Sequence, residues 1–141
     1  MWFNKIIVPI LKSPLHGLLS RGTMLLTFSG RKSGKVYTIP INYVCSGEHF
    51  LSTSQRDRTW WRNVGMGEVV SLVVKGKNVS AASYLVQTQA EVKAGLEEVL
   101  AKNPRYARYF KIRQFSDGAY DQDDLQRVSA EIILVRFEPV N

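Results

Sequence analysis

The strongest constraint on the fold of this chain is a series of β-type segments that are joined by short glycine turns rather than by helices. EVVSLVV and NVSAASYLV flank the turn KGKN, and TMLLTFS and VYTIPINYVC flank the turn GRKSGK, so each pair predicts a β-hairpin. Ser46 and Gly47 close a further hairpin into HFLST, and AEIILVRFEPV is the last strand. No alternating βαβ pattern occurs, which argues against a Rossmann domain.

Helical segments lie between the later strands. TQAEVKAGLEEVLAKN is the strongest, because Thr88 and Glu91 have the spacing of a capping box. Its expected apolar face consists of Val92, Leu96, Val99 and Leu100. DRTWWRNVG predicts a short helix that Asp57 or Thr59 caps and Gly65 ends, and NPRYARYF and DQDDLQRVS are shorter candidates. About six strands with helices inserted late predict an α+β fold around an antiparallel sheet or barrel.

Length and composition fit one globular domain over residues 1–141, with 45% hydrophobic and 22% charged residues. Residues 1–20 carry an apolar stripe at helical spacing, interrupted by Pro9, and lack the order of a cleaved signal peptide. This amphipathic segment either packs on its own domain or lies on a membrane surface as an interfacial anchor. The lone Cys45, expected on the apolar face of its strand, excludes an intrachain disulfide and fits a cytoplasmic location.

The charge is strongly one-sided. The chain carries a formal net charge of +7, and its first 47 residues contain six lysines and arginines but no acid. Such a segment favours an anionic partner, which could be nucleic acid, anionic lipid headgroups or a phosphorylated small molecule. No signature of a nucleic-acid-binding fold accompanies the charge, so nucleic acid ranks last. No Cys/His cluster with zinc-ligand spacing is present, and no metal is expected.

The turn GRKSGK is the candidate anion site. Gly30 and Gly34 can adopt positive φ, which would let consecutive backbone N–H groups converge on one point, and Ser33 adds a hydroxyl donor. The charges that surround these glycines are those of Arg31, Lys32 and Lys35. A cationic hairpin that is simply exposed to water explains the same residues, and the turn alone does not decide between the two readings.

The order LLTFSGRKSGKVYTIP, then a strand, then TWWRN, then two strands joined by a glycine turn resembles the deazaflavin-dependent nitroreductase family. The resemblance runs from about residue 25 to residue 86. It implies an antiparallel split β-barrel related to FMN-binding oxidoreductases, which commonly pair as homodimers through their sheets. It also implies hydride transfer from a reduced deazaflavin coenzyme, F420, to a small hydrophobic acceptor such as a quinone or a nitroaromatic.

The resemblance assigns roles to individual residues. The phosphate and the acidic tail of the coenzyme would be held by the turn that contains Gly30, Arg31, Lys32, Ser33, Gly34 and Lys35. The deazaflavin ring would lie along the backbone of Thr38, Ile39 and Pro40. The catalytic candidate beside the ring is Ser54, and further cofactor contacts would come from Arg56, Trp60 and Asn63.

Two departures from the family pattern concern the cofactor. Tyr37 stands where many members carry an arginine, and the loop SQRDRTWW is shorter than the family's glycine-rich loop, although Arg56, Arg58 or Arg62 can compensate. FMN therefore stays open as the alternative cofactor. A non-catalytic split-barrel module that binds FMN, haem or a lipid-like ligand is the alternative function.

Aromatic residues mark a candidate site for the acceptor. The segment after the strongest helix interleaves cations with Tyr106, Tyr109, Phe110 and Phe115. Amphipathic aromatics suit a quinone or nitroaromatic, so this segment is one candidate for the roof of an acceptor pocket. The alternative is an exposed helix whose aromatics pack inward. Trp60 and Trp61 point about 100° apart on a helix, so one can face the core and the other a pocket.

Overall fold

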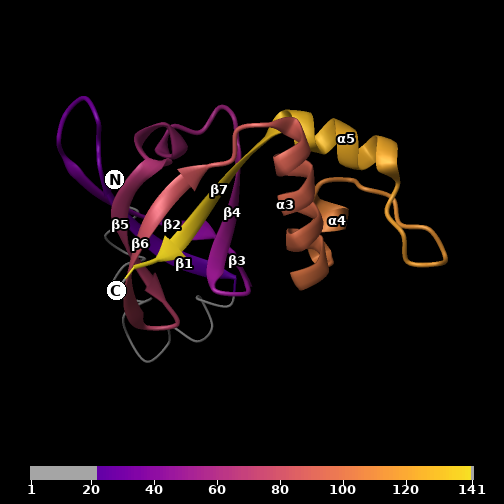
Figure 1. The fold of residues 1–141 in the computed structure, drawn as a ribbon, viewed down its shortest axis with the longest axis horizontal. Helices are drawn as coiled ribbons and strands as arrows, with labels where there is room; N and C mark the ends of the chain where they lie inside the picture. The colour runs from indigo at the N-terminus through magenta and orange to yellow at the C-terminus, as the bar shows by residue number, and fades with distance from the viewer. Residues whose placement is uncertain (1–21, 141) are drawn as a thin grey trace.

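The computed structural model describes residues 22–140, and the predicted amphipathic segment 1–20 lies outside this range. Seven antiparallel strands form one sheet in the order β2-β1-β5-β6-β7-β4-β3. The sheet curls into a half-barrel, and three helices gather beside one edge of it (Figure 1). The prediction of an α+β split β-barrel is confirmed.

The observed elements follow the predicted order. The strands are β1 (Thr23–Ser29), β2 (Val36–Asn42), β3 (Val44–Ser46), β4 (His49–Gln55), β5 (Met66–Val74), β6 (Lys77–Leu85) and β7 (Ile132–Pro139). The helices are the 3-10 helix η1 (Trp60–Asn63) and the α-helices α3 (Gln89–Lys102), α4 (Arg105–Tyr109) and α5 (Gln122–Glu131). In η1, Thr59 occupies the N-cap position without a side-chain hydrogen bond, so the predicted cap by Asp57 or Thr59 is wrong.

The strand predicted over residues 36–45 is broken in two. β2 pairs with β1, whereas β3 pairs with β4 on the other side of the sheet, so the chain must turn at Tyr43. The Tyr43 N–H donates to the carbonyl of Gly22 at 3.0 Å instead of to a neighbouring strand. Because the alternation is interrupted there, Cys45 is exposed rather than buried, and that prediction is wrong.

The two open sides of the half-barrel approach each other where a side-chain amide joins β2 to β4. Asn42 Nδ2 donates to the Thr53 carbonyl at 3.0 Å, and Asn42 Oδ1 accepts from the Thr53 N–H at 3.2 Å. The amide thus satisfies both backbone groups of Thr53, as a neighbouring strand would. The rest of β2 remains an edge of the sheet.

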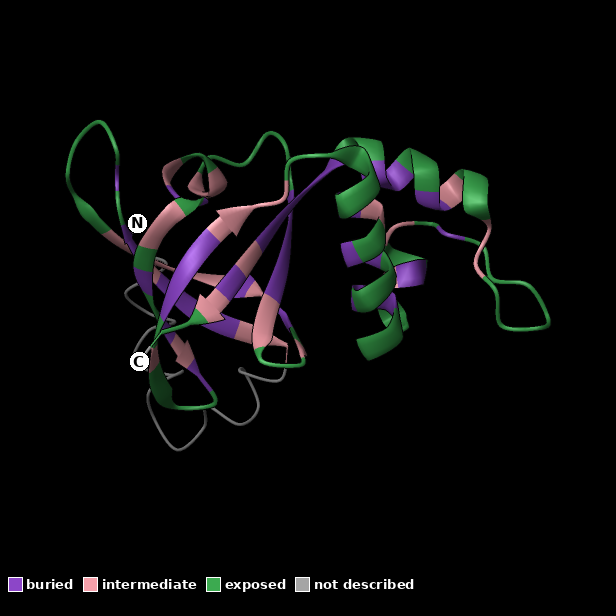
Figure 2. Cartoon of the chain, in the orientation of Figure 1, coloured by how far each residue is buried: buried purple, intermediate pink, exposed green. Residues whose placement is uncertain are grey.

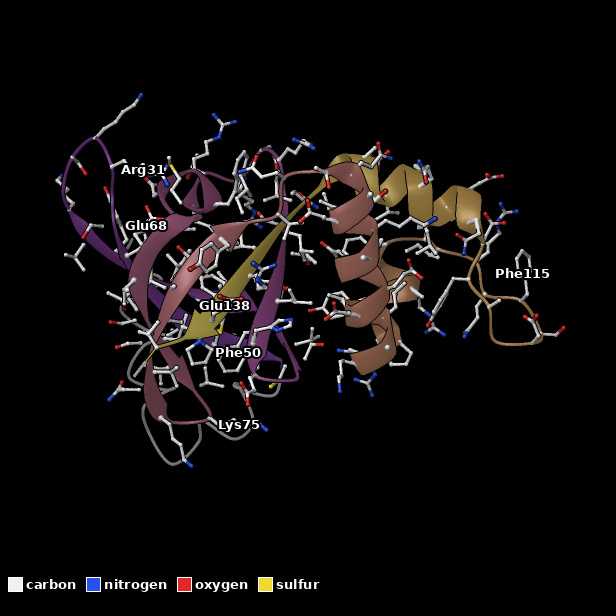
Figure 3. All side chains as sticks on the ribbon, viewed as in Figure 1. Arg31, Phe50, Glu68, Lys75, Phe115 and Glu138 are labelled. Atoms are coloured by element: carbon white, nitrogen blue, oxygen red, sulfur yellow. The ribbon has the colours of Figure 1, made fainter. Side chains whose placement is uncertain are left out.

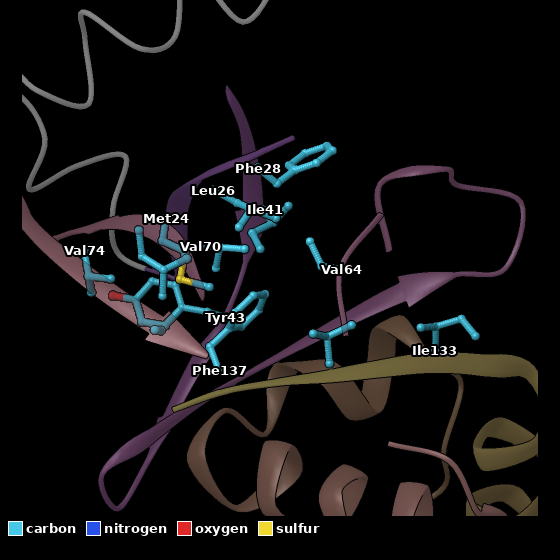
Figure 4. Close-up of a cluster of buried hydrophobic side chains, with 13 residues drawn as sticks. Met24, Leu26, Phe28, Ile41, Tyr43, Val64, Val70, Val74, Ile133 and Phe137 are labelled. Carbon is cyan, nitrogen blue, oxygen red and sulfur yellow. The ribbon is translucent and has the colours of Figure 1, made fainter. Parts of the chain in front are cut away.

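The sheet separates two hydrophobic cores, and β7 belongs to both. Ile133, Val135 and Phe137 face the barrel core, which Figure 4 shows in close-up. Ile132 and Leu134 point the other way, into the core beneath the helices. Buried positions consequently run along both faces of β7, and this strand is buried along most of its length in Figure 2.

Helix α3 attaches the helical layer to the sheet. Its start is the predicted one, since Thr88 Oγ1 accepts from the Glu91 N–H at 3.2 Å, and the four predicted face residues are all buried. Gly95 lies directly over the sheet, where a Cβ atom would stand 2.2 Å from Leu134 Cδ2. Close packing of helix on sheet therefore requires glycine at this position.

Candidate functional site

A large cleft lies between the β1–β2 turn, η1, the end of β4 and helix α4. Its volume is about 1180 Å³. That is above the usual range of small-molecule pockets, about 300–1,000 Å³, so a long ligand or two smaller ones can fit. The predicted site residues that line the cleft are Gly30, Arg31, Lys32, Ser33, Tyr37, Ile39, Pro40, Ser54, Trp60 and Asn63.

The backbone amides of the GRKSGK turn do not converge on an empty point. The Gly30 N–H donates to the Lys35 carbonyl and the Gly34 N–H to the Gly30 carbonyl, each at 2.8 Å. The Lys35 N–H donates to Ser33 Oγ at 3.2 Å, and the Arg31 N–H donates to Asn63 Oδ1 at 3.0 Å. The N–H groups of both glycines are thus used within the turn and that of Arg31 is used by η1, so the predicted nest is not formed by the glycine amides. The turn can still offer an anion its side chains and the N–H groups of Lys32 and Ser33.

The two glycines of the turn are needed for different reasons. Gly34 has a φ of +72°, which an L-residue with a side chain rarely adopts. Gly30 does not have positive φ, but a Cβ atom there would lie 2.9 Å from Ser33 Oγ and 3.1 Å from the ring of Tyr37. The prediction of positive φ is therefore correct for Gly34 and wrong for Gly30. At Gly30, glycine is needed because there is no room for a side chain.

Arg31 ties the turn to the barrel. Its Nη2 donates to Glu68 Oε2 at 3.1 Å and to the Val64 carbonyl at 3.2 Å. Arg31 and Glu68 are 37 residues apart in the sequence but lie close together in the structure (Figure 3). With Asn63 on its backbone N–H, Arg31 joins the turn to η1 and to β5.

Glu68 was not singled out by the sequence analysis, yet it is the partner that fixes Arg31. The register of β5 against β6 shifts between Met66 and Val69, and this bulge presents the Glu68 side chain to the turn. Glu68 Oε1 accepts from the Met66 N–H at 2.6 Å. Burial acts to raise the pKa of Glu68, but hydrogen bonds from the Met66 N–H and from Arg31 outweigh it and hold that pKa below its ordinary value. In the sequence, the glycines on both sides of Met66 were the feature that could have indicated this bulge.

Besides Arg31, three cations line the cleft at the end formed by the turn and η1. They are Lys32, Arg58 and Arg62. None of them forms an ion pair with another residue in the range 22–140. Arg62 instead stacks over the Trp61 ring at 5.1 Å. We call these three residues the cationic end of the cleft.

The wall between the two ends comes from β2, β4 and η1. Tyr37, Ile39 and Trp60 are partly buried and pack on the barrel core. Ser54 is nearly buried, and its hydroxyl donates to the carbonyl of the next residue, Gln55, at 3.0 Å. The apolar side chains on this wall suit one face of a flat ring.

Four predicted site residues, Gly34, Lys35, Thr38 and Arg56, do not line this cleft. The Thr38 hydroxyl pairs with that of Thr27 at 2.8 Å across the β1–β2 hairpin. Arg56 donates to the Ala130 carbonyl at 3.3 Å and lines a smaller cavity, of about 330 Å³, between β6, α3 and α5. Trp61 also lines this second cavity, so the two adjacent tryptophans do face different spaces.

The opposite end of the cleft is aromatic. Helix α4 contributes Tyr106, Tyr109 and Phe110, which we call the aromatic end. The Tyr106 and Phe110 rings stack with centroids 5.9 Å apart, and Tyr109 meets Phe110 edge to face at 5.0 Å. Burial, and to a lesser extent Tyr109, raises the pKa of Tyr106, so its hydroxyl stays protonated at neutral pH. Phe115 lies far from the cleft at the tip of a loop (Figure 3).

The part of the chain that the structure describes shows neither a metal-binding cluster nor a membrane-spanning helix. Over residues 22–140, no group of His, Cys, Asp or Glu side chains is arranged to hold a metal ion. In the same range no helix has both the length and the apolar character needed to cross a bilayer.

The comparison with protein families decides the family. Residues 13–114 match the F420H(2)-dependent quinone reductase family. The chain belongs to this family. No curated protein matches the chain.

Solved structures agree with this chain on the fold. A structure described as an F420-H2 dependent reductase (FDR-A) has 20% identity and a TM-score of 0.57, over 84% of this chain and 95% of that one. A structure described as a domain-swapped dimer has 21% identity and a TM-score of 0.58, over 97% of both chains. The haem storage protein HutZ from Vibrio cholerae has 12% identity and a TM-score of 0.59, over 98% of this chain and 91% of that one.

The cleft of this chain fits the cofactor of its family. A deazaflavin coenzyme has a flat heteroaromatic ring and a long anionic tail. The cationic end offers Lys32, Arg58 and Arg62, whose charges no described carboxylate neutralises. The wall offers Ile39 and Pro40 from β2, a strand whose outer edge has unpaired backbone groups that can hydrogen-bond a ring. The donor set and the shape of the cleft therefore match both parts of the molecule.

Proposed function

We propose that this chain is an oxidoreductase that binds reduced F420 and passes hydride to a quinone-like acceptor held in the same cleft. Membership of the F420H2-dependent quinone reductase family is one support. The observation that carries the proposal is a single cleft with unpaired cations at one end and a cluster of aromatic rings at the other. One end suits an anionic tail, and the other suits a flat apolar acceptor.

The proposed cofactor site begins with the coenzyme tail on Lys32, Arg58 and Arg62. Arg31, already paired with Glu68, keeps the turn in place and adds positive potential rather than a free guanidinium. Ser33 offers a hydroxyl at the same end. Gly30, Gly34 and Lys35 shape the turn that presents these groups.

The ring of the coenzyme is proposed to lie on the wall formed by β2 and η1. The backbone of Ile39 and Pro40 would face its polar edge, with Tyr37, Trp60 and Asn63 bordering it. Thr38 contributes by joining β1 to β2 through its hydroxyl. When bound, the reduced coenzyme supplies the hydride, and the protein has to orient it, exclude water and hold the acceptor.

The acceptor is proposed to lie against the aromatic end. Tyr109 and Phe110 give it a flat apolar surface, and the Tyr106 hydroxyl, protonated at neutral pH, is a hydrogen-bond donor for a reduced quinone oxygen. Ser54 remains the catalytic candidate, on the wall between the two ends. Its hydroxyl is bonded to the neighbouring carbonyl, so it would act after rotating toward the acceptor.

The proposal is tested by titrating the purified protein with F420 and separately with FMN, followed by turnover with menadione. We expect F420 to bind more tightly than about 10 μM, near −7 kcal/mol, and menadione to oxidise its reduced form steadily. Tyr109→Leu should raise the KM for menadione about fivefold with little change in F420 affinity, because it removes a ring but no charge. Tight binding of FMN or haem without turnover would instead support a non-catalytic binding module.

We further propose that residues 1–141 form one domain, that the protein is cytoplasmic and that it forms a homodimer. Met66 and Val69 are exposed apolar residues on β5, 79% and 61% accessible, and a second copy could cover them. A neighbouring fold described as a domain-swapped dimer makes this worth testing. Light scattering should give twice the chain mass, and Val69→Lys should shift it toward the monomer.

A further inference from the structure

The residues of the aromatic end belong to a very short helix and the residue that follows it. Helix α4 has only five residues, and it is followed at once by Lys111 in the left-handed region, with a φ of +58°. A residue with a side chain rarely adopts this conformation unless its surroundings hold it there. Tyr109, the outermost ring, is 64% exposed, so burial contributes little to its position. The buried Ala107 and Ile112 anchor the segment in the core on either side, so the exposed turn between them is the place where a further contact can act.

Helix α5 contacts the turn after α4 through the side chain of Arg127. Its Nη2 donates to the Lys111 carbonyl at 3.1 Å and to the Phe110 carbonyl at 3.4 Å. These are the two carbonyls immediately after α4, at the point where the chain turns into its left-handed residue. The same guanidinium lies 3.8 Å from Glu131 and 4.0 Å from Asp124, which keep it on the surface of α5.

A second contact fastens the next residues of the segment. Asp124 Oδ2 accepts from the Arg113 N–H at 2.9 Å and from Arg113 Nε at 3.0 Å. Arg113 Nη2 also pairs with Asp121, the N-cap of α5, at 3.1 Å. The hydrogen bond from the Arg113 side chain, together with that from its backbone N–H, holds the pKa of Asp124 below its usual range. Helix α5 thus binds the carbonyls of residues 110 and 111 and the amide of residue 113.

We propose that Arg127 is a positioning residue for the acceptor, because it holds the backbone next to Tyr109 and Phe110 on α5 without itself lining the cleft. The proposal deepens the function proposed above and rests on it. Without Arg127, the carbonyls at residues 110 and 111 lose their partner and the left-handed turn loses its support. The rings would then sample several positions, and the acceptor would meet a disordered surface.

The test compares Arg127→Ala with Arg127→Lys and with the control Arg105→Ala. Arg105 lies on α4, and its side chain makes no hydrogen bond or ion pair in the range 22–140, so the control removes the same charge from the same region. For Arg127→Ala we expect the KM for menadione to rise about tenfold, while kcat at saturation and the Kd for F420 change less than about twofold. Arg127→Lys, which can still donate to a carbonyl, should restore part of the effect.

Hydrogen exchange on the cofactor-free proteins supplies a readout that does not depend on turnover. Amides of residues 106–112 should exchange faster in Arg127→Ala than in the control, while those of β1 and β5 stay unchanged. Equal KM values in Arg127→Ala and the control, or exchange that is faster throughout the chain, would overturn the positioning role. If the wild type reduces no quinone, the proposed function fails. The inference is then tested by the Kd for menadione, measured by fluorescence quenching of the cofactor-free proteins. This Kd should be about tenfold lower for the wild type than for Arg127→Ala, and equal values would overturn the inference.

Discussion

The two ends of the cleft are built differently. The cationic end rests on a hairpin turn and a 3-10 helix that Arg31 fastens directly to the barrel, through Glu68, Val64 and Asn63. The aromatic end rests on a five-residue helix that is fastened to α5 instead. The proposed cofactor contacts are therefore fastened to the sheet, whereas the proposed acceptor contacts belong to a separate layer. Substitutions at the two ends should separate cofactor affinity from acceptor affinity.

The largest expected effect is at the cationic end. Lys32→Ala combined with Arg58→Ala should raise the Kd for F420 about a hundredfold, since each lost charge-assisted hydrogen bond costs about 1.5 kcal/mol or more. Neither side chain pairs with another residue in the range 22–140, so the melting temperature should hardly move. Calorimetric titration against the control pair Lys93→Ala and Lys102→Ala, two cations on α3 that do not line the cleft, checks this. Equal weakening in both pairs would mean that only net charge matters.

The stability of the helical layer, which carries the aromatic end, should depend on its close packing against the sheet. Alanine is normally the better helix residue by about 1 kcal/mol, but a methyl group at Gly95 would overlap Leu134 at the junction of α3 and β7. Overpacking costs typically about 1–3 kcal/mol, so Gly95→Ala should lower the free energy of unfolding by about 1 kcal/mol. Urea denaturation measures it, with Lys93→Ala as the control. A stabilised variant would show that the helix can move away from the sheet freely.

The elements of the fold were predictable from local sequence, and most of the exceptions occur where distant segments meet. Period-2 alternation identified β7, and the capping box gave the start of α3 at Thr88. The break at Tyr43 was not predictable, because it depends on β2 and β3 having different partners. Alternation within one segment carries no information about which strand lies beside it.

The same limit explains the errors in the site. The turn residues were found from their composition, and most of them do line the cleft. Their hydrogen bonds were not foreseen, since Asn63 and Glu68 reach Arg31 from 32 and 37 residues away. Arg127 could not be identified either. On α5 it reads as an ordinary surface cation, and only the position of the α4 carbonyls gives it a role.

A smaller effect would measure how firmly the cationic end is tied to the barrel. Arg31→Ala, Glu68→Ala and the double variant form a cycle whose coupling energy in unfolding should be about 0.5–1 kcal/mol, as for a partly exposed ion pair. The two side chains are 39% and 38% exposed, which keeps the value modest. A coupling near zero would mean that the turn stays in place through Asn63 and the Val64 carbonyl rather than through the ion pair.

The smallest expected effect is on stability at acid pH. It concerns helix α5, to which the aromatic end is fastened. The pKa of Asp124 in the folded protein is below its unfolded value because of Arg113, with Arg127 acting in the same direction. The native state therefore binds fewer protons. The contribution to stability is complete above about pH 4 and is lost as the pH falls through the folded-state pKa. In Asp124→Asn, the melting temperature should therefore fall less steeply than in the wild type as the pH is lowered from about 5 to about 2. Asp123→Asn, which removes the neighbouring acid, serves as the control.

Successive side chains of β7 belong in turn to the barrel and to the layer beneath the helices. A strand shared in this way cannot slide or rotate without disturbing both halves of the molecule at once, so no hinge line runs between them. The walls that the barrel gives to the cleft should therefore keep their relative positions when a ligand binds or leaves.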